Sequence, residues 1–268
     1  MYAMNKPDTL VVTPTLGNRS SLSKTIQTVA TVGGDRVKHV LVTPLGKYDE
    51  LKACFPSVTI VPEPENCRGI YTALNYALKK FAGDFIYLTY INDDDYWLPD
   101  FKRLFSLLDN NEHVEVAYGR TLYVDENGHI RGEQTSMPAY KAFHHLLRAN
   151  IILFTQQATL MRSAIYLQHH GFDESYKLIA DSAFWLKLIR EGTKFSYINK
   201  LCAAYTIQEN QLSSDKNVQS SERRILLNQL GKPSHTYKTL LYKWLFRVYN
   251  LRIYLSRICS LKPLNPSK

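Results

Sequence analysis

Short apolar runs alternate with amphipathic segments through the first hundred residues of the chain. Four runs have the length of buried strands and cover residues 9–16, 37–43, 57–63 and 84–91. Three segments between them carry apolar residues at helical spacing and cover residues 21–32, 47–54 and 68–82. Strands that alternate with helices indicate βαβ units, and therefore a mostly parallel sheet with helices on both faces. We expect a Rossmann-like α/β fold.

The second half of the chain is less regular. Its predicted elements are a helix from Pro99, a hairpin over 114–130, a helix over 139–150, a strand and two helices over 156–192, two short strands near 194–206 and a helix near 217–230. The segment GKPSH, residues 231–235, is predicted as a linker to one more helix over 236–260. We therefore expect a main domain over residues 1–231 and a helical appendage over 232–268.

The positive charge of the chain is concentrated at its end. The formal net charge is +9, from 33 Lys and Arg against 24 Asp and Glu. Eight of these bases and none of the acids lie in residues 232–268, which leaves a nearly neutral body. A neutral body with a basic tail argues against nucleic acid as the main partner.

The sequence indicates a protein of the cytoplasm. No run of 18 apolar residues is free of charge, as a membrane-spanning helix requires, and the first ten residues lack the pattern of a secretory signal. The four cysteines stand far apart, without the spacing of a zinc site. We expect reduced thiols and a cytoplasmic location.

Three consecutive aspartates, Asp93, Asp94 and Asp95, follow the last of the four predicted N-terminal strands. In parallel sheets, ligands bind at the carboxyl ends of the strands. Adjacent carboxylates repel each other, and a hard cation such as Mg²⁺ or Mn²⁺ would remove that repulsion with oxygen ligands from the protein and from a substrate phosphate. The segment therefore predicts a metal ion and a diphosphate ligand. The alternative is a solvated turn whose aspartates cap the next helix.

Four segments together resemble the family 2 glycosyltransferases with the GT-A fold. They read VVTPTLGNRSSLSKTIQTV, ENCRGIYTALNYALKKFAGDFIYLTYIND, YINDDDYWLP and QQATLMR…GFDESYKLIADSAFWLKLIREG. They occur in the family's order, and the resemblance covers residues 8–230. It implies the GT-A fold, a nucleotide-diphosphate sugar as donor, Mn²⁺ or Mg²⁺, and a single inverting displacement. It also implies an acceptor that is a glycan or is polyprenyl-linked, in the synthesis of a cell-surface polysaccharide.

The resemblance assigns roles to the acidic segment. Asn92 takes the place of the first aspartate of the family's D-x-D motif and Asp94 takes the second, with Asp93 at the variable position between them. Asp94 is therefore the first expected metal ligand and Asp95 the second. Asn92 and Asp93 are expected to contact the donor nucleotide.

The resemblance also places the catalytic base. Asp181 matches the aspartate that serves as the family's catalytic base, and Ala180 replaces the acidic residue that usually precedes it. A base is needed because the acceptor hydroxyl must lose its proton as it attacks the sugar. Asp181 would begin a helix, whose dipole stabilises a carboxylate. The alternative role for Asp181 is a plain helix-terminal charge.

The expected donor contacts at the first strand are Pro14, Thr15 and Arg19, the alternative for Arg19 being a solvated loop residue. Two carboxylates common in the family are replaced, by Thr43 after the second strand and by Thr72 in the next helix. We therefore expect binding to depend less on the nucleotide base and more on the diphosphate and the sugar.

Other classes of function remain open from the residues alone. A nucleotidyltransferase would share an α/β core, but it usually has a Gly-rich basic loop after the first strand, where this chain reads TPTLGNRSSL. A non-catalytic nucleotide-sugar-binding module is favoured by the replacements at Thr43, Thr72, Asn92 and Ala180. A nucleic-acid-binding tail is disfavoured by its dense leucine and aromatic content.

The predicted helix over 236–260 has an apolar stripe. Leu240, Trp244, Val248, Leu251, Leu255 and Ile258 share an arc of roughly 80° at helical spacing, and the Lys and Arg side chains lie outside that arc. An apolar face, aromatics and bases without acids are typical of a helix lying on an anionic membrane. We expect peripheral binding to the inner face of the plasma membrane. The alternatives are packing on the protein's own core or on a second subunit in a homodimer.

Overall fold

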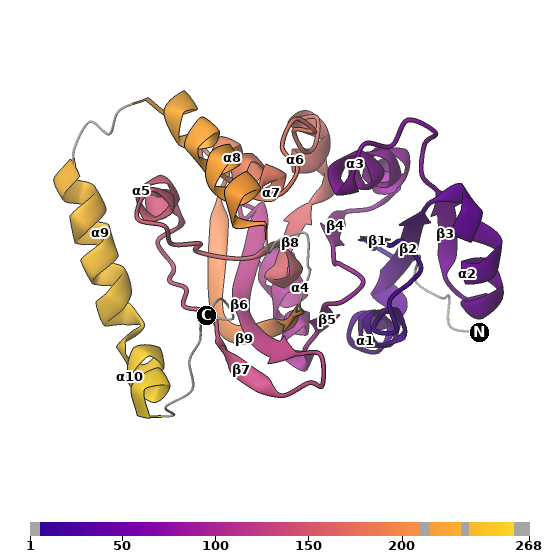
Figure 1. Cartoon of the computed structure of the whole chain (residues 1–268), viewed down its shortest axis with the longest axis horizontal. Coiled ribbons are helices and arrows are strands. Elements are labelled where there is room, and N and C mark those ends of the chain that lie inside the picture. The colour runs from indigo at the N-terminus through magenta and orange to yellow at the C-terminus, as the bar shows by residue number, and fades with distance from the viewer. Residues whose placement is uncertain (1–5, 209–214, 232–235, 260–268) are drawn as a thin grey trace.

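The four N-terminal apolar runs form the parallel half of a mixed sheet in the computed structural model, which describes residues 6–208, 215–231 and 236–259 (Figure 1). They are β1 (Thr9–Pro14), β2 (Val37–Thr43), β3 (Thr59–Pro62) and β4 (Tyr87–Tyr90). All neighbouring pairs among them are parallel, in the order β3-β2-β1-β4. The mostly parallel N-terminal sheet is therefore confirmed.

Helices cover both faces of this half. They are α1 (Leu22–Gly33), α2 (Tyr48–Cys54) and α3 (Ile70–Phe81), close to the predicted bounds. Successive residues of β1 point to opposite faces: Leu10 and Val12 join the core beneath α3, and Val11 joins the core beneath α1. This division explains why β1 reads as a continuous apolar run rather than an alternating one.

The second half extends the sheet with antiparallel and parallel pairs. Its strands are β5 (Tyr96–Trp97), β6 (Val116–Asp125), β7 (Ile130–Glu133), β8 (Thr159–Arg162) and β9 (Phe195–Ile207). Beyond β4 the order is β8-β6-β9-β5, with β7 paired to β6. Only the β6–β9 pair is parallel among the described pairs of this half. The result is a GT-A-like α/β arrangement with a mixed sheet.

The two short strands expected near 194–206 are one continuous strand, β9. Exposed Asn199 and Lys200 interrupt its apolar pattern, which is why the sequence suggested a break. The ladder to β6 shifts register around Arg120 and then continues. Pairing with a long partner strand thus overrides the local polar signal.

The helices of the second half are α4 (Lys102–Asp109), α5 (Phe143–Arg148), α6 (Ser163–Gln168), α7 (Ala180–Arg190), α8 (Lys216–Gln229), α9 (Thr236–Tyr249) and α10 (Leu251–Cys259). Short 3₁₀ helices occur at Gly34–Arg36, Leu45–Lys47, Ala82–Asp84, Pro99–Phe101, Tyr140–Ala142 and Gln156–Ala158. The expected linker at 232–235 and the chain after residue 259 lie outside the described residues.

The single helix expected over 236–260 is divided in two at Asn250. The Asn250 side chain is buried, accepts a hydrogen bond from the Ser136 N–H (3.1 Å) and donates one to the Phe246 carbonyl (2.8 Å). Phe246 is fully buried and belongs to the main core. The appendage is therefore attached to the body along one face rather than held away from it.

Candidate active site

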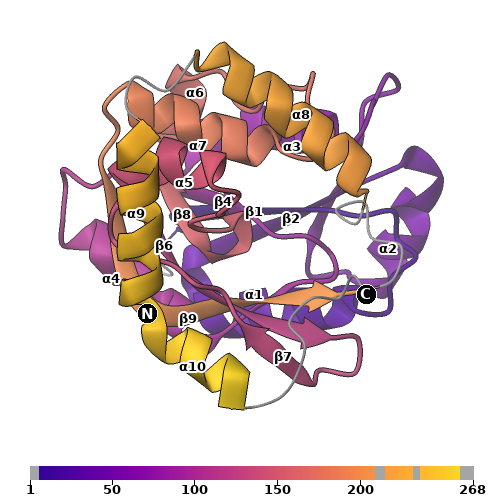
Figure 2. The same ribbon diagram turned by 60° about the vertical axis from the view of Figure 1, so that its left-hand side comes forward.

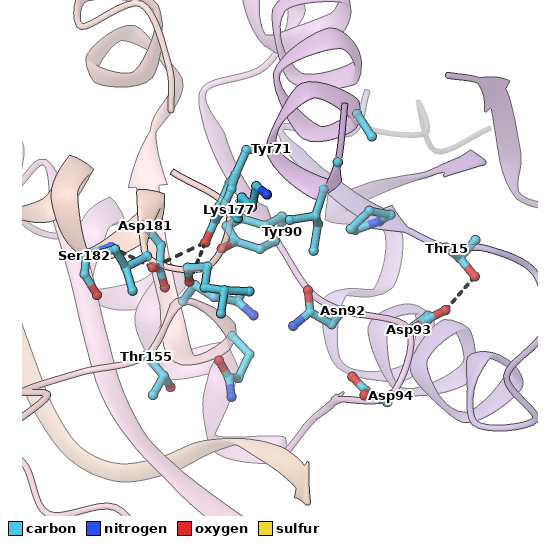
Figure 3. Close-up of a pocket in the computed structure, with 18 of the residues that line it drawn as sticks. Thr15, Tyr71, Tyr90, Asn92, Asp93, Asp94, Thr155, Lys177, Asp181 and Ser182 are labelled. Atoms are coloured by element: carbon cyan, nitrogen blue, oxygen red, sulfur yellow. Dashed lines mark hydrogen bonds between the residues drawn. The ribbon is translucent and has the colours of Figure 1, made fainter. Parts of the chain in front are cut away.

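One pocket of about 760 Å³ joins the carboxyl ends of β1, β2 and β4 to the N-terminus of α7 (Figure 3). Seven of the eight expected donor, metal and base residues line it, and Asp95 does not; the seven are Pro14, Thr15, Arg19, Asn92, Asp93, Asp94 and Asp181. Residues more than 160 positions apart in the sequence thus meet in one cavity.

Arg19 forms ion pairs with the first two aspartates. Its Nε lies 3.2 Å from Asp93 Oδ1 and its Nη1 lies 2.9 Å from Asp94 Oδ2. The Thr15 hydroxyl donates a 2.7 Å hydrogen bond to Asp93 Oδ2, and the guanidinium also contacts Gln208. Arg19 is therefore part of the site and not a solvated loop residue. Burial nevertheless raises the pKa of Asp93, since Thr15 and Arg19 oppose that effect only in part.

Asp95 points away from the pocket. Its side chain is fully buried, and Oδ1 accepts a hydrogen bond from the Thr206 N–H of β9 at 3.0 Å. Its main-chain carbonyl accepts a 2.7 Å hydrogen bond from the Thr25 hydroxyl of α1. Burial and the neighbouring Asp94 raise the pKa of Asp95 well above its usual range. The structure therefore does not bring this expected metal ligand to the cavity, because the carboxylate fastens the acidic segment to β9.

The residues that remain in the pocket fit a hard divalent cation. Asn92 Oδ1 is buried and has no hydrogen-bond partner in the structure, and Asp94 offers carboxylate oxygens on the same wall. Among the described residues, no three His, Cys, Asp or Glu side chains gather into a complete metal site. Mg²⁺ and Mn²⁺ commonly take few protein ligands and complete their shell with substrate phosphates. The side-chain oxygens of Asn92 and Asp94 would supply two such protein ligands.

Asp181 lies at the other end of the pocket, in the first turn of α7 (Figure 3). Its Oδ1 accepts a 2.6 Å hydrogen bond from the Ser182 N–H and lies 3.4 Å from the Tyr71 hydroxyl. That hydroxyl also lies 3.2 Å from the Leu178 carbonyl, so its single proton is shared between two acceptors. Burial raises the pKa of Asp181 to about 6, although these hydrogen bonds oppose it. Desolvation therefore outweighs the expected stabilisation by the helix terminus.

Three aromatic residues pack together on the side of this carboxylate where Tyr71 contacts it. The ring centroid of Phe172 lies 5.5 Å from that of Tyr71 and 5.4 Å from that of Tyr90. Burial raises the pKa of both tyrosines well above their usual range, so both hydroxyls remain protonated donors. A low-dielectric setting with neutral donors suits a carboxylate that must accept a proton near neutral pH.

Helix α8 positions the segment that leads to Asp181. Glu222 is buried and accepts hydrogen bonds from the N–H groups of Lys177 (2.6 Å) and Leu178 (2.9 Å). Lys177 and Arg223 also line the pocket, and sequence reasoning did not identify either as a site residue. The only signal for Lys177 was its place inside the motif GFDESYKLIAD, and Arg223 carried none.

The turn before α7 is clamped to α3. Asn75 donates to the Phe172 carbonyl (2.8 Å) and to Glu174 Oε1 (2.7 Å), and its Oδ1 accepts from the Phe172 N–H (2.9 Å). Thr72, which replaces a family carboxylate, donates a 3.0 Å hydrogen bond to Glu174. Gly171 has φ +82°, and a Cβ there would lie 2.6 Å from Asn75 Oδ1, so glycine is required. Helix α3 and the segment that leads to Asp181 are thus one connected unit.

Thr43, the second replacement, does not line the pocket. Its Oγ1 is buried without a hydrogen-bond partner in the structure, and its carbonyl accepts a 2.8 Å hydrogen bond from the Glu63 N–H. Glu63 lines the pocket, and its carboxylate therefore lies near the carboxyl end of β2, where Thr43 replaces the family's carboxylate.

Comparisons with known proteins agree with this architecture. The chain is 25% identical over 181 residues to an uncharacterised glycosyltransferase of Methanocaldococcus jannaschii, and the match covers 63% of this chain and 59% of that protein. The fold superposes on residues 1–349 of S. aureus TarS in complex with UDP-GlcNAc with a TM-score of 0.63 and 16% identity, over 87% of this chain and 69% of that TarS chain.

A second solved structure shares the fold. The mannosyltransferase PcManGT from Pyrobaculum calidifontis, in complex with GDP-Man and Mn²⁺, matches with a TM-score of 0.59 and 14% identity, over 88% of this chain and 68% of the other. The sequence profile described as glycosyl transferase family 2 matches residues 11–169, which is more than half of the chain. The chain belongs to glycosyl transferase family 2.

Proposed function

We propose that the protein transfers a sugar from a nucleotide-diphosphate donor to a hydroxyl of a glycan or lipid-linked acceptor, with inversion at the anomeric carbon. The observation that carries the proposal is that Asp94 and Asp181 line one pocket from different ends. The solved relatives that hold UDP-GlcNAc and GDP-Man support a nucleotide sugar as donor. We propose a role in cell-surface polysaccharide synthesis on the cytoplasmic side of the membrane.

The donor would lie at the carboxyl ends of β1 and β4, with its diphosphate near Arg19 and its sugar directed toward α7. Arg19, Lys177 and Arg223 supply positive charge around the cavity. A Mn²⁺ or Mg²⁺ ion held by Asp94 and Asn92 would neutralise charge on the leaving diphosphate. Asp93 holds Arg19 in place through its 3.2 Å ion pair.

In the chemical step, the acceptor oxygen forms a bond to the anomeric carbon while the bond from that carbon to the diphosphate oxygen breaks. The electron pair of that bond leaves with the nucleoside diphosphate, and the acceptor proton passes to a carboxylate oxygen of Asp181. A pKa of about 6 leaves Asp181 ionised at neutral pH yet more basic than an ordinary aspartate. The Tyr71 hydroxyl orients the carboxylate.

The proposal is tested with the full chain, Mn²⁺ and a panel of UDP-, GDP-, CMP- and dTDP-sugars. We expect one donor class to raise the melting temperature and to release its nucleoside diphosphate, slowly to water and faster with an acceptor. Asp94→Ala and excess chelator should abolish turnover, whereas Asp49→Ala, a change at an exposed acid of α2, should not.

Two results would contradict the proposal. If no nucleotide sugar stabilises the protein, the donor assignment is wrong. If a donor binds but neither hydrolysis nor transfer follows with any acceptor, the chain is a nucleotide-sugar-binding module and not an enzyme.

A further inference from the structure

The outer face of α9 and α10 exposes large apolar side chains in a continuous line. The exposed fractions are 67% for Leu240, 60% for Trp244, 50% for Val248, 54% for Leu251 and 51% for Leu255. These are five of the six residues of the apolar stripe found in the sequence, and the side chain of the sixth, Ile258, lies outside the described residues. Burial of such side chains lowers the free energy relative to their exposure to water, and a patch of exposed apolar side chains is typical of a binding surface.

The opposite face of the same helices is already occupied. Tyr242 packs on the core and stacks on His145 of α5 with ring centroids 5.2 Å apart, and Phe246 is fully buried. The Thr239 hydroxyl lies 3.0 Å from His145 Nδ1, and Asn250 bonds to Ser136. Own-core packing therefore accounts for this side of the helices, and the apolar line is exposed to solvent on the other. Both helices lie on the outside of the molecule (Figures 1 and 2).

Charge identifies the partner. The segment 236–259 contains five bases and no acid. At about 100° per residue, Lys243 and Arg247 flank the apolar line of α9 on one side and Lys238 lies on the other, while Arg252 is exposed on α10. Arg257 is turned to the body, where it donates a 2.6 Å hydrogen bond to the Glu133 carbonyl. A self-associating interface would bring these like charges together, whereas an anionic lipid surface would neutralise them.

We propose that this outer face of α9 and α10 lies on an anionic membrane surface, with the apolar line in the headgroup layer and the flanking bases against lipid phosphates. In the part of the chain that the structure describes, no helix has the length and hydropathy to cross a bilayer. The inner face of α9 packs on α5 and Arg257 of α10 bonds to Glu133, so the membrane contact would orient the whole protein.

That orientation brings the pocket near the lipid. Helix α5 packs on α9, and its Leu147 lines the pocket, so one layer of helix separates the membrane face from the cavity. A lipid-linked acceptor would then reach Asp181 without leaving the membrane. This consequence rests on the proposed function, whereas membrane binding does not.

Trp244 provides a direct probe. Of the three tryptophans in the chain, Trp97 and Trp185 are each 1% exposed, and Trp244 is 60% exposed. The full chain should bind phosphatidylglycerol-containing vesicles but not pure phosphatidylcholine vesicles at low salt. Binding should blue-shift the emission of Trp244 and allow quenching by brominated lipid, and it should weaken with added salt.

Matched variants separate the two contributions. Leu240→Ser with Leu251→Ser should weaken binding on the order of tenfold or more, and Arg247→Gln with Arg252→Gln should weaken it about fivefold per base. Leu45→Ser, at a residue that is 71% exposed outside these helices, should bind like wild type. Donor binding should be unchanged in every variant, which separates this proposal from the proposed function.

Two outcomes would overturn the inference. The first is that the full chain ignores anionic vesicles at low salt. The second is that Trp244 emission shifts with protein concentration in the absence of lipid, while sedimentation shows a dimer that the Leu240→Ser, Leu251→Ser variant loses. That result would assign the same face to a second copy of the chain.

Discussion

The two acidic regions of the pocket differ in what stabilises their buried carboxylates, which is a cation in one region and neutral hydrogen-bond donors in the other. Asp93 and Asp94 are held against the Arg19 guanidinium at 3.2 and 2.9 Å. Asp181 has no ion pair among the described residues and is held by the Ser182 N–H and the Tyr71 hydroxyl. In the first arrangement, pairing with Arg19 opposes in part the rise that burial causes in the pKa of Asp93. In the second no described residue forms an ion pair, and burial raises the pKa of Asp181 to about 6.

The difference separates binding from chemistry. A paired carboxylate is a poor proton acceptor but a good holder of cations, and a desolvated carboxylate with a raised pKa is a better base. Asp95 shows a third case, since it is buried beside like charges and its pKa is raised well above the usual range. Three adjacent aspartates are therefore tolerated because the single cation of Arg19 pairs with two of them and the third favours its protonated form.

The largest expected effect is at Asp181. Asp181→Asn keeps the size and most hydrogen bonding but removes the base, so the turnover number should fall on the order of 10²–10⁴-fold. Donor affinity, measured by titration calorimetry, should stay within a factor of a few. Asp49→Asn, at an exposed acid of α2, is the control. Turnover close to wild type would make Asp181 only a helix-terminal charge and remove the contrast between the two regions.

Removal of Arg19 should lower the free energy of unfolding, because two buried carboxylates lose the cation with which they pair. Arg19→Gln leaves Asp93 and Asp94 without their cation, and unfolding at neutral pH should become easier by about 1–3 kcal/mol. Arg19 opposes the rise in the pKa of Asp93, so this pKa should rise further in the variant. The loss should be present above that pKa and shrink as the pH falls and Asp93 protonates.

Denaturant unfolding at several pH values measures this effect. Arg103→Gln, which breaks the exposed Arg103–Asp100 pair, should cost no more than about 0.5 kcal/mol. If Arg19→Gln lowers the free energy of unfolding no more than that control does, the ion pairs of Arg19 do not stabilise the folded protein.

A smaller effect is expected at Tyr71. Its hydroxyl lowers the pKa of Asp181 by hydrogen bonding, so Tyr71→Phe should raise that pKa further above its value of about 6. The base must be ionised, so activity is lost as the pH falls through the pKa, and this acidic limb should move to higher pH. At pH 7 the rate should fall about two- to fivefold. Tyr76→Phe, at a more exposed tyrosine of the same helix, should leave the profile unmoved.

The smallest effect is expected at Asp95. Asparagine resembles a protonated aspartate, so Asp95→Asn should keep the hydrogen bond from the Thr206 N–H and change the unfolding free energy by less than about 1 kcal/mol. Activity should stay within a few-fold of wild type, in contrast to Asp94→Ala. Loss of metal-dependent donor binding in Asp95→Asn would show that Asp95 reaches the ion after all.

The sequence by itself determined the parallel N-terminal strands, the helices between them and the positions of the acidic segment and Asp181. These features follow from local hydrophobic periodicity and from motifs that are contiguous in the chain. It also located the apolar stripe of the tail, because a helical arc depends only on residue spacing. Each of these properties can be evaluated within a window of about 10 to 20 residues.

Only the tertiary structure decided which way each side chain of the acidic segment points. Asp94 and Asp95 are neighbours in the chain, yet one lines the pocket and the other bonds to β9, more than 100 residues away. The partner of Arg19, the continuity of β9 past Asn199 and the raised pKa of Asp181 likewise depend on distant residues. Burial and pairing are set by what packs around a residue, and that information is not contained in its local sequence.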